Sequence, residues 1–307
     1  MKHYSVMKDE VIESLNINPN GIYVDATLGY GGMSESILKR LDKGLLIGID
    51  QDIEAIKYSD ELLKKIGKNY KLVKSNFVRL KEILEEEKIE KIDGIIFDLG
   101  FSSPQIDDEK RGFSFMKDAP LDMRMDLDNT RTAKNIINNY SEDSLAKIFF
   151  EYGEEKLSKV IAKKIVDVRN EKEINTTLEL VNIIEKATGA NYFYKNHPER
   201  KIFQALRIEV NDELNVLENV IEKGVDFLKV GGRMSVITFH SLEDRIVKKK
   251  FKNLSEVNEF YKGMPNIPDE YKPKIKLINK KPIEPTLKEI KENSRSHSAK
   301  LRIIERI

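Results

Sequence analysis

Cysteine and tryptophan are absent from this chain of 307 residues, and histidine occurs only four times. Without cysteine there is no disulfide framework, no thiolate nucleophile and no cysteine-ligated zinc, which favours a reducing, cytoplasmic setting. Long apolar runs are also missing. No stretch approaches the roughly 20 apolar residues that cross a bilayer, and the beginning of the chain lacks the apolar core of a signal peptide. We therefore expect neither a membrane protein nor a secreted one.

A surplus of either charge is lacking as well, since 53 Lys and Arg stand against 52 Asp and Glu, a net charge of +1. Nucleic-acid-binding proteins usually carry a basic surplus, so this total by itself argues against a polyanionic partner. The charges are unevenly distributed, however. Residues 245–307 hold 17 basic and 8 acidic side chains, whereas 1–244 hold 36 and 44. Binding of phosphates by a local basic patch in 245–307 therefore stays open.

The first hundred residues alternate short apolar runs with segments of helical period, a pattern typical of strands and helices around a parallel sheet. The predicted strands are 22–26, 45–50, 71–74, 94–99 and 234–239, with a strand-like segment at 301–304. Asp52 is well placed to cap the helix that follows the second strand. These patterns predict an α/β protein.

A segment of different composition interrupts this pattern. Residues 100–130 are polar and irregular, and so long a segment within a compact protein is usually functional or mobile. Helical patterns follow, one of which opens with a capping box of Thr176 and Glu179. The α/β pattern then resumes in a single predicted helix over 206–221. The predicted division is a core of 1–103 and 204–307 with an inserted helical subdomain of 104–203.

Residues 24–32 predict a strand that runs into a glycine-rich turn and opens a helix. Glycine lets the chain turn tightly and lets backbone N–H groups approach a ligand. The dinucleotide-binding pattern would place a third glycine where this chain has Ser34. Asp50 ends the second strand, where an acidic side chain can bind both ribose hydroxyls of a nucleoside. The turn and the carboxylate predict a nucleoside cofactor, without separating S-adenosylmethionine from NAD.

Asp98 ends the fourth predicted strand. Ligands of open α/β sheets bind outside the carboxyl ends of the strands, so Asp25, Asp50 and Asp98 are expected to edge one crevice. Three carboxylates would repel a pyrophosphate and attract a cation, which favours a sulfonium cofactor. His240, after the fifth strand, would lie on the same rim as a proton acceptor or as a structural histidine. Its neighbour Ser241 lacks the flanking glycines of a hydrolase nucleophile.

Aromatic and basic residues are interleaved over 191–203. If exposed, such a strip would stack unpaired bases and pair with phosphates. If buried, its aromatic side chains would anchor the insert to the sheet. The sequence leaves both interpretations open, and the presence of Arg111, Arg124 and Arg131 favours nucleic acid.

Motifs along the whole chain resemble those of the bacterial S-adenosylmethionine-dependent 16S rRNA (cytosine-N4)-methyltransferases. The most specific are 98–105, 120–126 and 239–245, supported by 24–32, 49–52, 76–77, 111–115, 203–208 and 298–302. The resemblance implies a class I (Rossmann-like) methyltransferase core with a mostly parallel, doubly wound sheet and an inserted helical subdomain that recognises RNA. It also implies a target cytosine in the decoding centre (P-site region) of 16S ribosomal RNA, with the small ribosomal subunit as partner.

The same resemblance implies the residues of the site. Cofactor contacts are carried over to Gly31, Gly32, Met33, Asp50, Phe77, Asp98 and Gln105. Asp98 is expected nearest the reacting centre, with Ser102 and Ser103 accepting hydrogen bonds from the cytosine amine. His240 is a further catalytic candidate, and no metal is expected.

Three positions depart from the family pattern. Tyr30 and His297 stand where the family often has arginine, and Met33 stands where it commonly has histidine, so the contact assigned to Met33 is expected through its backbone. Two alternatives stay open: a nicotinamide-dependent oxidoreductase and a non-catalytic RNA-binding assembly factor. The sequence also leaves open whether the chain forms a homodimer.

Overall fold

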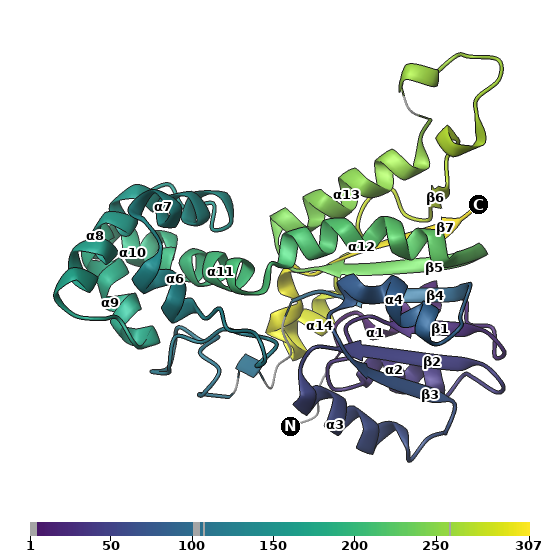
Figure 1. Cartoon of the computed structure of the whole chain (residues 1–307), viewed down its shortest axis with the longest axis horizontal. Helices are drawn as coiled ribbons and strands as arrows, with labels where there is room; N and C mark the ends of the chain where they lie inside the picture. The colour runs from purple at the N-terminus through teal and green to yellow at the C-terminus, as the bar shows by residue number, and fades with distance from the viewer. Residues whose placement is uncertain (1–4, 101–104, 107, 258) are drawn as a thin grey trace. The chain divides into compact units, whose positions relative to one another are not determined.

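The computed structural model describes residues 5–100, 105–106, 108–257 and 259–307. The chain forms two compact units (Figure 1). The sheet unit comprises Met1–Gly100 and Leu214–Ile307, and the helical unit comprises Phe101–Glu213. Within the described segments, no helix is both long and apolar enough to cross a membrane.

The sheet unit is built on a seven-stranded sheet of order β3-β2-β1-β4-β5-β7-β6. The strands are β1 (Ile22–Asp25), β2 (Leu45–Asp50), β3 (Tyr70–Lys74), β4 (Ile92–Asp98), β5 (Leu228–Thr238), β6 (Ile275–Leu277) and β7 (Lys300–Arg306). The strands from β3 to β5 pair in parallel, whereas β7 and β6 pair antiparallel. The predicted α/β fold with a mostly parallel sheet is confirmed.

Helices cover both faces of this sheet (Figure 1). The helices of the sheet unit are α1 (Lys8–Ser14), α2 (Gly32–Leu38), α3 (Ile53–Leu63), α4 (Leu80–Glu86), α12 (Glu213–Phe227), α13 (Ser241–Ser255) and α14 (Leu287–Glu292), with short 3-10 turns η1 (Phe77–Arg79), η2 (Glu259–Tyr261), η3 (Asp269–Tyr271) and η4 (Ser294–Ser298). Ile95 and Phe97 of β4 belong to a buried cluster with α4, α12 and α13, whereas Ile96 belongs to a cluster with α1 and α2. Successive strand residues point to opposite faces, so this apolar run is buried on both, as in a doubly wound fold.

The helical unit has its own core. Its helices include α6 (Ala133–Asn139), α7 (Glu142–Glu151), α8 (Ser158–Glu171), α9 (Thr177–Thr188), α10 (Ala190–Asn196) and α11 (Pro198–Asn211). Phe149 of α7, Ile161 of α8 and Phe203 of α11 are buried in one cluster. The predicted capping box is confirmed, because the Thr176 hydroxyl accepts a hydrogen bond from the Glu179 amide, and the Glu179 carboxylate accepts one from the Thr176 amide.

The predicted single helix over 206–221 is wrong, because two helices occupy this segment. α11 ends at Asn211, Asp212 adopts a left-handed conformation with a φ of 53°, and α12 begins at Glu213. The apolar spacing continues across the break, so periodicity alone could not reveal it. The two units also divide at this break. Residues 204–213 therefore belong to the helical unit rather than to the predicted core.

Several short elements lie outside the predicted pattern. β5 begins at Leu228 rather than at residue 234, and β6 has only three residues, held by pairing with β7. α6 and α10 have seven residues each, about two turns, too few for a clear helical period. In contrast, the predicted cap of α3 is confirmed, because Asp52 Oδ1 accepts a hydrogen bond from the Glu54 amide at 3.0 Å.

A buried ion pair ties α13 to β7. The Arg302 guanidinium donates to both carboxylate oxygens of Asp244, at 2.6 and 3.1 Å. The side chains of Arg302 and Asp244 are only 8% and 15% exposed. Asp244 and Arg302 belong to two of the sequence motifs, 239–245 and 298–302. Their ion pair gives both residues a structural role, which is to hold α13 against β7.

We predict that Asp244→Ala destabilises the protein by roughly 3–5 kcal/mol, because it leaves a buried guanidinium without its partner. The control is Glu54→Ala, since the ion pair between Glu54 and Lys57 is 61% and 64% exposed and is expected to contribute less than about 1 kcal/mol. Urea unfolding of both variants measures the difference. Equal losses would contradict the structural role of Asp244.

Candidate active site

Three strands of the sheet unit end in an aspartate at the same edge of the sheet. β1 ends at Asp25, β2 at Asp50 and β4 at Asp98. β1 lies between the other two strands and runs parallel to both. The structure therefore brings the three predicted carboxylates to one rim, the position at which open α/β sheets bind ligands.

Asp50 holds the glycine-rich turn in place. Its Oδ2 accepts a hydrogen bond from the Gly29 amide and its Oδ1 accepts one from the Asp52 amide, both at 2.8 Å. Burial raises the pKa of Asp50 to about 6. Each carboxylate oxygen can accept a second hydrogen bond, so Asp50 retains the capacity to bind hydroxyl groups of a ligand.

Asp25 is 1% exposed and is satisfied from within the chain. Its Oδ2 accepts a hydrogen bond from the Ser34 hydroxyl at 2.7 Å, and its Oδ1 accepts one from the Thr27 amide at 3.3 Å. Burial raises the pKa of Asp25 to about 6. Ser34, the residue that departs from the dinucleotide-binding pattern, is therefore the partner of a buried carboxylate.

Asp98 differs from the other two aspartates in having an unsatisfied oxygen. Its Oδ1 is buried without a hydrogen-bond partner among the described residues, while its backbone amide donates to the Thr27 hydroxyl at 2.6 Å. Burial, followed by the negative charges of Asp25 and Glu243, raises the pKa of Asp98 to about 8. A buried acceptor without a donor is costly in a folded protein and indicates a place where a ligand donates.

His240 follows β5 and immediately precedes α13, next to a buried glutamate. The Glu243 Oε2 accepts hydrogen bonds from the backbone amides of Phe239 and His240, at 2.8 and 3.2 Å. The Glu243 Oε1 lies 3.2 Å from His240 Nε2, but neither ring nitrogen forms a hydrogen bond within the described part of the chain. The sequence motifs did not single out Glu243, although a glutamate three residues after a helix cap is a recognisable signal.

The glycine turn and Phe77 approach the same rim. Gly31 caps α2, and Gly32 is its first residue. A Cβ at Gly32 would lie 2.1 Å from the Ser5 hydroxyl, so the turn packs closely. Phe77 packs edge-to-face on Phe97, with ring centroids 5.6 Å apart. It lies in η1, directly after β3, the neighbour of the strand that ends in Asp50.

The side chain of Met33 is buried in the core of the sheet unit. It is 4% exposed and belongs to the apolar cluster beneath α1 and α2. Its backbone alone is available for the predicted contact. Ser102 and Ser103 lie outside the described residues, and Gln105 belongs to the helical unit, where it is buried. The predicted roles of these three residues therefore stay predictions.

Two of the arginines that favoured a nucleic-acid surface serve the interior of the helical unit. Arg111 is 7% exposed and donates to the carbonyl oxygens of Arg124 and Met125, at 2.9 and 3.1 Å. Arg124 in turn donates to both carboxylate oxygens of Asp122, at 2.9 and 2.7 Å. The burial of Arg111 argues against its place on a nucleic-acid surface. The side chain of Arg124 is 22% exposed, and its contribution to such a surface stays a prediction.

The strip over 191–203 is divided between core and surface. Phe193, Ile202 and Phe203 are buried in the core of the helical unit, whereas Tyr194 is 67% exposed. The buried aromatic side chains thus anchor α10 and α11 to their own unit. Helical periodicity sorts the strip in this way, because neighbouring residues of a helix face different directions.

Comparison with known proteins identifies the class. The model of the MraW methylase family matches residues 1–307. The chain therefore belongs to the MraW methylase family and is a methyltransferase. This finding decides against the oxidoreductase alternative.

Relatives in the family are similar along their whole length. The chain is 53% identical over 307 residues to proteins named ribosomal RNA small subunit methyltransferase H from two strains of Clostridium botulinum, Loch Maree and Kyoto, covering 100% of this chain and 99% of each relative. Among solved structures, an rRNA methylase from Streptococcus thermophilus is 15% identical, with a TM-score of 0.42 and coverage of 98% and 93%. A likeness of that size adds nothing to the family assignment.

The raised pKa of Asp98 predicts a cost in stability. Between its ordinary value of 3.8 and the folded-state value of about 8, the folded chain retains a proton that the unfolded chain has lost. Stability therefore falls as the pH rises through this window. Asp98→Asn removes this loss and is expected to raise the free energy of unfolding at pH 9 by roughly 1–3 kcal/mol relative to the unchanged protein, with a smaller gain at pH 5.

Urea unfolding at both pH values measures this effect. The exposed Asp42, changed to asparagine, serves as the control for the substitution itself. If Asp98→Asn is less stable than the unchanged protein at pH 9, the charged carboxylate of Asp98 does not lower the stability of the folded chain, and the prediction is wrong.

Proposed function

We propose that this methyltransferase transfers a methyl group from S-adenosylmethionine to the exocyclic N4 of a cytosine in the decoding centre, the P-site region, of 16S ribosomal RNA. The buried and unsatisfied Oδ1 of Asp98 carries the proposal, because it is an acceptor placed where a substrate amine can donate. The names of the relatives, which specify ribosomal RNA of the small subunit, support the class of substrate.

The charge of the rim fits S-adenosylmethionine. Bound there, this cofactor supplies an electrophilic methyl group carried on a sulfonium cation. Asp25, Asp50 and Asp98 stand at the ends of adjacent strands, and burial raises the pKa of each. A nearby cation favours the charged form of such carboxyls, whereas a pyrophosphate would be repelled by them. The residues present therefore fit a sulfonium and do not fit a dinucleotide.

Each side chain of the rim has a separate task in this proposal. Asp50, held by the Gly29 and Asp52 amides, accepts hydrogen bonds from the ribose hydroxyls. Phe77 covers the adenine, and the turn at Gly31 and Gly32 leaves room for the methionine end. Gln105 completes the adenine side, as the family resemblance implies.

The target amine needs help, because its lone pair is delocalised into the cytosine ring. Asp98 Oδ1, Ser102 and Ser103 accept hydrogen bonds from the amine, which localises the pair and holds the nitrogen in line with the methyl group. Without a ligand, burial raises the pKa of Asp98 to about 8. The positive charge of the bound cofactor would lower this pKa and leave a carboxylate able to take the released proton. His240 is the further candidate at this end of the rim.

The RNA must present an unstacked base to such a site, which is easiest in a loop or a single-stranded region. The helical unit is proposed as the part that recognises the RNA, and the small ribosomal subunit as the partner. A cytoplasmic location and a homodimer stay predictions. The second candidate, a non-catalytic RNA-binding assembly factor, is separated from the enzyme by a test of methyl transfer.

We predict that Asp98→Ala lowers methyl transfer by at least about 100-fold, the usual contribution of a positioned proton acceptor. The measurement is transfer of labelled methyl from S-adenosylmethionine to small ribosomal subunits that lack the modification, with naked 16S ribosomal RNA assayed beside them. Asp42→Ala, at an exposed position, is the control and should retain activity. Full activity of a folded Asp98→Ala protein would sink the proposal.

We also predict that Asp50→Ala weakens S-adenosylmethionine binding by roughly 10- to 100-fold, because charge-assisted hydrogen bonds to the ribose are lost. Isothermal titration calorimetry measures the affinity, and Asp42→Ala should bind as the unchanged protein does. Preferential binding of NAD by the unchanged protein would overturn the cofactor assignment.

A further inference from the structure

The solvent-facing side of α13 carries positive charge and no negative charge. The exposed residues of this 15-residue helix are Ser241, Arg245, Lys248, Lys249, Lys252 and Asn253. Lys248, Lys249 and Lys252 follow Arg245 by three, four and seven positions. They therefore share one face over successive turns. We call the surface formed by Lys248, Lys249 and Lys252 the α13 basic face.

The acidic residues of α13 are used internally. Glu243 accepts hydrogen bonds from backbone amides at the end of β5, and Asp244 binds Arg302 of β7. The neighbouring Lys250 is neutralised by Glu222 of α12, at 2.8 Å. In contrast, no acidic side chain within the described residues pairs with Lys248, Lys249 or Lys252. The tertiary contacts thus remove negative charge from α13 and leave its exposed face basic.

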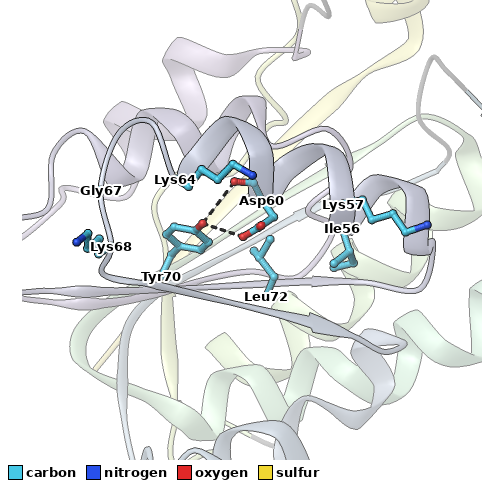
Figure 2. Close-up of a pocket in the computed structure, with 8 residues that line it drawn as sticks. All are labelled: Ile56, Lys57, Asp60, Lys64, Gly67, Lys68, Tyr70 and Leu72. Carbon is cyan, nitrogen blue, oxygen red and sulfur yellow. Dashed lines mark hydrogen bonds between the residues drawn. The ribbon is translucent and has the colours of Figure 1, made fainter.

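A solvated helix face ordinarily mixes both signs of charge, and α3 of the same unit does so. Its Lys57 pairs with Glu54 at 2.8 Å. The adjoining groove, about 610 Å³ in volume, is lined by Asp60 together with Lys57, Lys64 and Lys68 (Figure 2). The Asp60 carboxylate accepts a hydrogen bond from the Tyr70 hydroxyl at 2.8 Å. A polyanion gains less at that groove, because a carboxylate stands among the lysines.

The position of the α13 basic face connects it to the active site. α13 begins at Ser241, directly after His240 on the rim, and a helix of this length extends about 22 Å. Beyond its far end, Figure 1 shows the chain continuing into an extended excursion before β6. There Phe260 is 73% exposed, and the rings of Tyr261 and Tyr271 stack with centroids 4.1 Å apart.

We propose that the α13 basic face binds the phosphodiester backbone of a single-stranded segment of the RNA substrate, and that Phe260 stacks on one of its bases. Lysines and arginines along a groove or helix with an aromatic side chain beside them are the elements that bind single strands without reading sequence. The proposal rests on the proposed function, since it takes RNA as the substrate. It adds the surface along which the RNA strand next to the target base would lie.

The test uses the salt dependence of RNA binding. Each phosphate neutralised by a lysine steepens the slope of log affinity against log salt concentration by about 0.7 for a single strand. The triple variant Lys248→Gln, Lys249→Gln, Lys252→Gln should therefore lose about 2 from this slope. The matched control is the triple variant Lys57→Gln, Lys64→Gln, Lys68→Gln in the groove of Figure 2, which changes the net charge equally.

Binding is measured on the full chain with a synthetic RNA of the decoding-centre sequence, from low to physiological salt. A large change of slope for the α13 variant and a small one for the control supports the proposal. Equal changes would mean that net charge alone steers the RNA, and an unchanged slope for the α13 variant would mean that other residues bind the phosphates. Either of these two outcomes overturns the inference.

Phe260→Ala provides an independent readout. Loss of base stacking should weaken RNA binding by roughly tenfold or more without changing the salt slope. Unchanged affinity would remove Phe260 from the proposal. Leu287→Ala, at a position of the sheet unit that is 79% exposed, is the control for loss of an exposed apolar side chain.

These experiments separate the inference from the proposed function. S-adenosylmethionine binding, measured by calorimetry, should be unchanged in every variant, because none of these side chains lies at the rim. Methylation of RNA by the unchanged protein, together with normal RNA binding by the α13 variant, would overturn the inference alone. If the unchanged protein neither binds nor methylates RNA, and the α13 basic face instead binds an acidic protein, both proposals fail.

Discussion

The burial of negative charge at one edge of the sheet is the constraint on which the rest of this protein depends. Removing several carboxylates from water is costly, and their mutual repulsion adds to the cost. Backbone amides and one hydroxyl offset it: Ser34 for Asp25, the Gly29 and Asp52 amides for Asp50. Of these three aspartates, Asp98 has an oxygen without a partner among the described residues, and its pKa is raised the most, to about 8. The rim is therefore stable as a scaffold and attractive to a cationic cofactor and an amine.

The internal pairing of acidic side chains also reconciles the nearly neutral net charge with a basic surface. The acidic side chains of α13 form contacts with the end of β5 and with β7, while most of its basic side chains are exposed to solvent. The Asp244–Arg302 pair links the helix to the sheet and at the same time takes one negative charge out of the surface field. A net charge of +1 thus combines an acidic rim with a basic helix face. Total charge says little about partners when the two signs occupy different surfaces.

Sequence patterns predicted the parallel strands well, because each is a short apolar run buried on both faces by helices. They predicted the three aspartates at the rim for a related reason, since each directly ends such a run. They failed at Asp212, where one left-handed residue divides a helix without interrupting the apolar spacing. They also misjudged Arg111, because a basic residue in a polar segment gives no indication that its donors point into the protein.

The sequence by itself determined the α/β class, the positions of the main strands along the chain and the membership in a methyltransferase family, because these depend on local periodicity and on motifs read along the chain. Only the tertiary structure decided which charges are satisfied and which are available. Gly29 and Asp50 are 21 residues apart and Asp244 and Arg302 are 58 apart, and their contacts exist only once the sheet has formed. Desolvation and hydrogen bonding act between neighbours in space, so the unsatisfied oxygen of Asp98 and the basic face of α13 are properties of the folded chain.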